Sequence, residues 1–121
     1  MRWYNQINAV SATTSDVMPT NNFENISFEL LCSGHTSGSG TLTVLGSNDG
    51  INFTAIAFVN PSVANTNAQN ITRVTSIVAN SNGAVLGCLE NSFKFECIKF
   101  TLTYLTDGVY SLIVHADKKS T

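Results

Sequence analysis

The chain is 121 residues long, which is typical of one domain, and 43% of its residues are hydrophobic, enough to build a core. Only 12% of the residues are charged and the formal net charge is −2, so the sequence has no basic stripe of the kind that nucleic-acid binding needs. Asparagine contributes 14 residues and serine plus threonine contribute 27, so its polarity is mostly neutral. We expect one domain over residues 1–121, with a surface suited to contacts with other proteins or with sugars.

The N-terminal segment is predicted to contain a strand followed by a polar arm. Residues 2–10 alternate moderately, which indicates the strand. Ser11–Asn22 is rich in Ser, Thr and Asn and contains Pro19, so we expect a loop or arm with no obvious strand partner. The aromatic residues Trp3 and Tyr4 are candidates for anchoring a neighbouring subunit, although Trp3 could equally fill the core of its own domain.

Phe23–Ser33 is predicted to be a strand with one buried face. Phe28, Leu30 and Cys32 share one parity, and the residues between them are mostly polar, with Leu31 as the exception. The Gly- and Ser-rich stretch Gly34–Gly40 that follows is predicted to be a flexible connection between two strands.

The strongest pattern in the sequence is a strand, tight turn and strand over Gly40–Val59. Asn48, Asp49 and Gly50 supply the turn, because Asn and Asp bond their own backbone and Gly adopts positive φ without steric cost. Asp49 could also contribute to a calcium site with loop oxygens. A single carboxylate is a weak basis for that reading, since the turn alone explains an Asp-Gly pair.

The middle of the chain is predicted to alternate between loops and short strands. Asn60–Gln69 is polar and opens with Asn-Pro, which indicates a loop. Asn70–Ala79 is predicted to be a strand, residues 80–83 a turn, and residues 84–86 another short strand.

A second strong strand region is predicted over Phe93–Tyr104. Its apolar parity switches at Cys97 and Ile98, which indicates a β-bulge. Asp107 and Gly108 are predicted to turn a hairpin, so that residues 109–115 pair back on the preceding strand. With no helical periodicity anywhere, we expect an all-β antiparallel sandwich of about seven or eight strands, either jelly-roll or immunoglobulin-like.

The cysteines and histidines form no recognisable metal or nucleophile motif. Three cysteines at wide spacing argue against a disulfide framework; Cys32 is predicted to be a buried free thiol, while Cys88 and Cys97 flank a turn and could pair. His35 and His115 match no catalytic pattern. We therefore expect a protein that is not an enzyme, with no catalytic residues, no bound metal and no cofactor.

The sequence also bears on the cellular setting. It contains no apolar leader segment and no apolar run long enough to cross a membrane, so we expect folding in the cytoplasm and no membrane partner. Tyr104 and Tyr110 could stack on sugar rings, but their place on apolar strand faces favours a role in the core.

The stretch from Leu42 to Thr54, LTVLGSNDGINFT, resembles a hairpin of small β-sandwich structural proteins of bacteriophages, and residues 95–114 are similar to the way those proteins close. The stretch is also similar to a hairpin of discoidin-like domains, but those usually bridge their termini with a disulfide and no cysteine lies near either end here.

The phage resemblance implies a non-enzymatic virion structural protein: a capsid decoration, spike-base or tail-associated component. Such a protein assembles in the host cytoplasm as a homo-oligomer, for example a trimer, and contacts other virion proteins. The alternative function is a carbohydrate-binding module with a glycan ligand.

Overall fold

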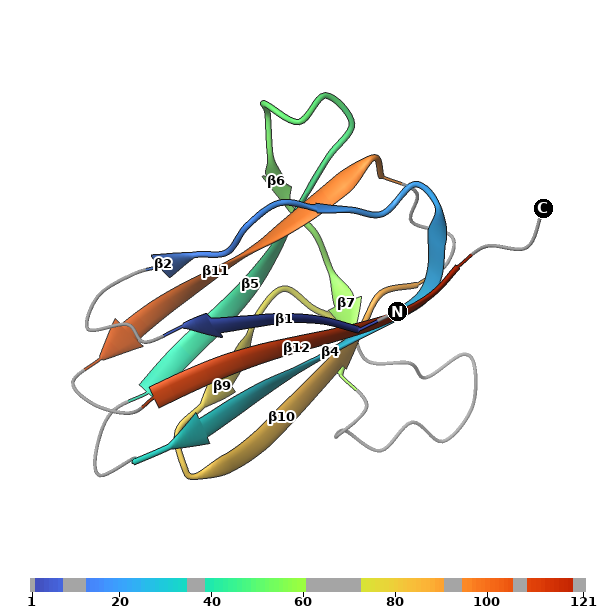
Figure 1. Cartoon of the computed structure of the whole chain (residues 1–121). Helices are drawn as coiled ribbons and strands as arrows, with labels where there is room; N and C mark the ends of the chain where they lie inside the picture. Colours follow the sequence, from blue (N-terminus) through green and yellow to red (C-terminus); the bar gives the residue numbers. More distant parts are fainter. Residues whose placement is uncertain are drawn as a thin grey trace.

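The computed structural model describes residues 2–7, 13–34, 39–60, 73–90, 95–105 and 109–118. Within these ranges every regular element is a β-strand, and all strand pairs are antiparallel. The strands form two sheets that pack face to face (Figure 1). The prediction of an all-β antiparallel sandwich is therefore confirmed. The strands are β1 (Arg2–Ile7), β2 (Thr13–Thr14), β3 (Met18–Pro19), β4 (Phe23–Ser33), β5 (Ser39–Ser47), β6 (Thr54–Ala55), β7 (Phe58–Val59), β8 (Arg73–Val74), β9 (Ile77–Ala79), β10 (Gly83–Cys88), β11 (Cys97–Leu105) and β12 (Val109–Lys118).

The strand order identifies the type of sandwich. Sheet A has the order β1-β12-β4-β10-β7-β8, and sheet B has the order β2-β11-β5-β6, with β3 also paired to β11 and β9 to β5. Consecutive long strands therefore alternate between the sheets: β4, β10 and β12 lie in sheet A, and β5 and β11 lie in sheet B. This alternation is the jelly-roll arrangement, so of the two predicted architectures the structure has the jelly roll.

The core lies between the two sheets and is built by the apolar parity of each long strand. On β4 the even-numbered residues from Ile26 to Cys32 are buried, as the alternation predicted. The ring of Phe28 meets the edges of two other rings, Phe58 from sheet A at 5.0 Å and Phe100 from sheet B at 5.2 Å between centroids. These edge-to-face contacts join strands of both sheets in the middle of the core.

The hairpin predicted at the C-terminal end is wrong. β11 pairs with β5, β2 and β3 in sheet B, whereas β12 pairs with β1 and β4 in sheet A. The connection between them therefore crosses from one sheet to the other instead of turning a hairpin. Asp107 and Gly108, which were expected to form that turn, lie outside the described residues.

The central hairpin is shorter than predicted. β6 pairs with β5 over only two positions, Leu45 with Ala55 and Gly46 with Thr54. The chain then crosses to sheet A, where β7 pairs with β10 and β8. The strand expected over Asn70–Ala79 is likewise divided in its described part: β8 belongs to sheet A and β9 to sheet B.

The arm Ser11–Asn22 does have a strand partner, so that expectation is also wrong. β2 and β3 both pair with β11, but Thr14 pairs with Thr101 and Met18 with Ile98, so the arm uses one more residue than β11 over this stretch. Ser15 spans the irregularity: its N–H donates to the Phe100 carbonyl at 2.8 Å, and its hydroxyl accepts the Phe100 N–H at 2.9 Å. The hydroxyl replaces a backbone acceptor, which keeps this buried edge satisfied.

The β-bulge predicted at Cys97 and Ile98 does not occur in the pairing of β11. β11 pairs with β5 in continuous register from Cys97–Ser47 to Leu105–Ser39. Cys97 and Ile98 are the first two residues of β11 and are both buried, and the Cys97 thiol donates to the Ser47 carbonyl at 3.8 Å. A register shift does occur elsewhere, in the pairing of β12 with β4 between His115 and Asp117.

Candidate interaction surface

The outer face of sheet A presents several apolar side chains to solvent. We define this outer face by the residues of β4, β10 and β12 whose neighbours in sequence point into the core. Among them, Leu86 and Val109 are 41% and 42% exposed, and Leu31 and Ile113 are half-buried. The outer face consists of Ser27, Glu29, Leu31, Ala84, Leu86, Val109, Ser111, Ile113 and His115.

A shallow hollow of about 220 Å³ lies on this face, lined by Ser27, Phe28, Glu29, Leu86, Ile113 and His115. The register of the sheet builds it: Glu29 pairs with Ile113 on β12 and with Leu86 on β10, and Ser27 pairs with His115. Its volume is below the roughly 300–1,000 Å³ of ordinary small-molecule pockets. The hollow therefore suits a protruding side chain of another protein better than a whole ligand.

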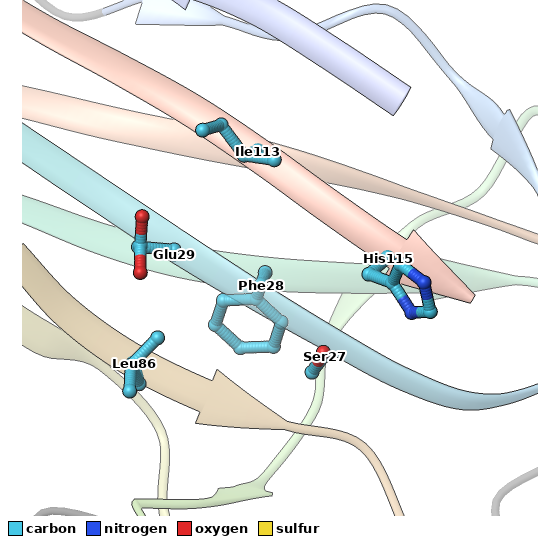
Figure 2. Close-up of a pocket in the computed structure, with 6 residues that line it drawn as sticks. All are labelled: Ser27, Phe28, Glu29, Leu86, Ile113 and His115. Carbon is cyan, nitrogen blue, oxygen red and sulfur yellow. The ribbon is translucent and has the colours of Figure 1, made fainter. Parts of the chain in front are cut away.

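The polar groups of the hollow do not converge. Figure 2 shows Glu29 and His115 at opposite ends of the group, with the buried ring of Phe28 between them. The structure gives no hydrogen bond or ion pair between Ser27, Glu29 and His115, all of which are described. The hollow thus offers apolar contact from Leu86 and Ile113, with one carboxylate and one imidazole at its rim.

The turn after β5 is closed by its own side chains. The Ser47 hydroxyl accepts from the N–H groups of Asp49 and Gly50 at 3.2 and 2.9 Å and donates to Asp49 Oδ1 at 2.9 Å. Asp49 Oδ1 also accepts from the N–H groups of Ile51 and Asn52, and its Oδ2 accepts from Asn52 Nδ2 at 2.7 Å. These donors, led by the Asn52 and Ile51 N–H groups, hold the pKa of the Asp49 carboxyl well below its usual range.

The same turn is hydrogen-bonded to Glu96, just before β11, and Glu96 is in turn bonded to the arm. Asn48 Oδ1 accepts the Glu96 N–H at 3.1 Å, and Asn21 donates to Glu96 Oε2 at 3.0 Å. Both carboxylate oxygens of Asp49 accept hydrogen bonds from donors within the turn, so their role is to hold the turn together. Across the ranges that the structure describes, no group of three or more His, Cys, Asp or Glu side chains could hold a metal ion.

Gly50→Val is expected to lower the free energy of unfolding by roughly 1 kcal/mol or more. Gly50 has a φ of 73°, which a β-branched residue rarely adopts, while no atom lies within 4 Å of an added Cβ. Backbone strain rather than crowding is therefore the cause. Chemical denaturation measures the effect, and Gly50→Asn is the matched control because Asn tolerates this conformation. Equal midpoints for the two variants would contradict the explanation.

Asp49→Asn is expected to lower the melting temperature at pH 7 and to lose that effect in acid. The folded-state pKa of Asp49 lies below its ordinary value of 3.8, so its carboxylate stabilises the fold fully above that value. The contribution is lost as the pH falls through 3.8 toward the lower folded-state pKa. Melting curves of both proteins from pH 7 down to about pH 2 test this, with Asp16→Asn as a control for the loss of one charge. A difference that stays constant across the range would refute the assignment.

The structure places the other candidate residues as follows. The backbone of Trp3 and Tyr4 lies in β1, paired with Val114 and Ile113 of β12, and their side chains lie outside the described part, as does the side chain of Tyr104. Tyr110 is fully buried, which confirms its role in the core. His35 is not among the described residues.

All three cysteines are free thiols, so the alternative in which Cys88 pairs with Cys97 is wrong. Cys32 is buried, as predicted. Burial, followed by the nearby charge of Glu90, raises the pKa of the Cys88 thiol above its usual value. None of the described residues forms a helix that could cross a membrane.

No family model and no curated protein matches this chain. Among solved structures, the fold is similar to the crystal structure of the SPBc2 prophage-derived protein YomS, with a TM-score of 0.63 and 11% sequence identity. The two chains share a fold. The likeness to YomS covers 97% of this chain and 94% of that chain, so it includes both sheets and not only one hairpin.

The apolar outer face is the feature that sequence reasoning missed. Leu31, Leu86 and Ile113 occupy outward parity on their strands, and the sequence showed only Leu31 as an exception to the alternation. Apolar residues at outward positions of three strands are the signal that could have revealed this face. Recognising it required knowing that β12, β4 and β10 are neighbours, which is also what brings these residues together.

Proposed function

We propose that this protein is a structural component of a bacteriophage particle, such as a capsid decoration, a spike base or a tail-associated subunit. It acts without catalysis, by assembling with copies of itself and with other virion proteins. The observation that carries the proposal is the fold shared with the prophage-derived YomS over 97% of this chain, reached independently of the phage-like hairpin in the sequence. Fold likeness at 11% identity supports the class of protein and leaves the position in the particle to experiment.

The surface supports the same proposal. The outer face of sheet A presents Leu31, Leu86, Val109 and Ile113 among small neutral residues, with only Glu29 and His115 as ionisable groups. Interface cores are depleted of charge and rely on shape and apolar contact. Such a face can pack against another subunit without a large desolvation cost.

The test is whether the chain is present in particles at a stoichiometric level. Particles produced by the genome that encodes this chain are banded on a density gradient, and each virion protein is quantified by mass spectrometry. The proposal expects a fixed copy number per particle that persists after washing in high salt. A chain found only in the lysate, or one that binds glycans on an array as a monomer, would reject the virion role and favour carbohydrate binding.

A further inference from the structure

The four edges of the two sheets are very unequal. On sheet B, one edge is formed by β2 and β3, two residues each and including Pro19, and the other by β6 and β9, of two and three residues. The far edge of sheet A consists of β8, two residues long, where Arg73 forms an ion pair with Glu90 at 2.6 Å, and of β10, which pairs with β7 only at Cys88. β10 carries glycine at positions 83 and 87, and glycine weakens a strand. Short strands, prolines and charges are the ordinary means by which proteins prevent edges from pairing with other chains.

The remaining edge is different. β1 is six residues long, contains neither proline nor glycine, and pairs with β12 in continuous register from Arg2–His115 to Ile7–Tyr110. Among the described residues, β12 is its only strand partner, and β1 ends the order of sheet A. In an edge strand about half of the backbone N–H and C=O groups point away from the sheet. β1 therefore offers a regular row of backbone donors and acceptors.

We propose that β1 pairs antiparallel with β1 of a second copy, so that two sheets A join into one continuous sheet across a two-fold axis. The proposal rests on the proposed function in assuming that the chain works by assembly, and it names the partner and the contact. A strand can pair with a copy of itself in this geometry. In an antiparallel pair related by a two-fold axis, both strands contribute the same backbone donors and acceptors to the contact.

The register of such a pair is restricted. The side chains of residues that face each other across antiparallel strands lie on the same side of the sheet. The two-fold axis must therefore pass midway between one residue and the same residue of the other copy. The two registers with the largest overlap centre on Tyr4 or on Asn5. When Tyr4 is the centre, Arg2 faces Gln6, and when Asn5 is the centre, Arg2 lies beyond the overlap. The one charged residue of β1 never faces its own copy, so no like charges oppose the pairing.

The symmetry of the contact decides the size of the assembly. Pairing β1 with β1 is an isologous contact, which uses the same edge strand in both copies and leaves neither β1 edge for a third copy. The assembly therefore closes as a dimer instead of extending as a filament.

Cysteine cross-linking tests the contact directly. Tyr4→Cys and Asn5→Cys are each made in full-length protein carrying Cys88→Ser, which removes the one native thiol that is not buried. Facing residues in antiparallel strands have Cα atoms about 4.5–5.5 Å apart, within the range of a disulfide. We expect one of these variants to become a covalent dimer of about twice 13.0 kDa under mild oxidation.

Ser111→Cys in the same background is the matched control. Ser111 lies on β12, one strand in from β1, so its copy would be more than about 14 Å away in the proposed dimer, too far to cross-link. Light scattering of the unmodified chain should show a dimer. The proposal is overturned if the chain is a monomer at all concentrations, or if it forms a dimer or trimer that neither β1 variant cross-links. It is also overturned if Ser111→Cys cross-links equally well, which would indicate contact through the outer face of sheet A.

The cross-linking experiment tests the pairing of β1 and the particle experiment tests the virion role, so either proposal can be rejected without the other. If β1 variants cross-link but the chain is absent from particles, the dimer stands and the virion role is rejected. If the chain is present in particles but the β1 variants stay monomeric, the pairing of β1 is rejected and the virion role stands.

Discussion

Replacing Phe28 with alanine is expected to lower the free energy of unfolding by about 3–5 kcal/mol, the usual cost of removing a buried aromatic side chain. Phe28 is 1% exposed and its ring touches the rings of Phe58 and Phe100, so it joins the two sheets at the middle of the core. Gly87 on β10 increases the cost. An added Cβ at Gly87 would lie 2.5 Å from the Phe28 ring, which shows that the backbone there is fitted closely to the ring.

Urea denaturation followed by tryptophan fluorescence and circular dichroism measures this effect. The control is Glu29→Ala on the same strand, where the side chain points to the outer face and a change within about 0.5 kcal/mol is expected. Equal losses for the two variants would mean that Phe28 has no special place between the sheets.

Gly40→Val is expected to destabilise the protein by about 1–3 kcal/mol through overpacking. A Cβ at Gly40 would lie 2.7 and 2.8 Å from two ring atoms of Tyr110 and 3.2 Å from Leu102. Tyr110 and Leu102 are both fully buried, so neither can move aside without disturbing the core. The ring of Tyr110 therefore requires glycine at position 40.

Thr41→Val is the matched control for Gly40→Val. It introduces the same side chain one residue later on β5, at a half-buried outward position, and should change the melting temperature little. Thermal melts of both variants give the comparison. A melting temperature for Gly40→Val equal to that of the wild type would show that Tyr110 can be displaced at no cost.

The faces of the long strands could be predicted from sequence because side chains alternate strictly along a strand. Phe28 and Leu30 on β4, and Tyr110 on β12, all lie on the predicted buried side. The turn at Asn48–Gly50 was also predictable, because its geometry depends on residues that are neighbours in sequence. Both are local properties of the chain.

The partners of the strands could not be predicted in the same way. Alternation shows that a strand has a buried face, but it does not show in which sheet the strand lies. The Asp-Gly pair therefore predicts a hairpin between β11 and β12, which lie in different sheets. Gly40 illustrates the same limit. Its segment has the composition of a flexible connection, and only the position of Tyr110, far away in sequence, reveals that Gly40 is a packing residue.

The candidate surface was less predictable than the fold. The outer face of sheet A combines residues from β4, β10 and β12, and no sequence-local pattern marks them as neighbours. The edge strand β1 was recognised as a strand, but its place at the end of a sheet follows from topology alone. Trp3 and Tyr4 are candidate anchors because of their aromatic side chains, whereas the proposed contact uses the backbone of the same strand.

The position of β12 has a consequence for how the protein is made. β12 is the last described strand of the chain, yet it lies between β1 and β4 in sheet A, where Arg2 pairs with His115. During synthesis, β1 and β4 therefore remain without their shared neighbour until residues 109–118 have left the ribosome. Pairing over such sequence separations is slow, in the range of milliseconds to seconds, because the loop-closure entropy is lost before the contacts form. Over that interval the backbone edges of β1 and β4 that pair with β12 are open to aggregation, and chaperones that shield nascent strands should raise the yield of folded protein.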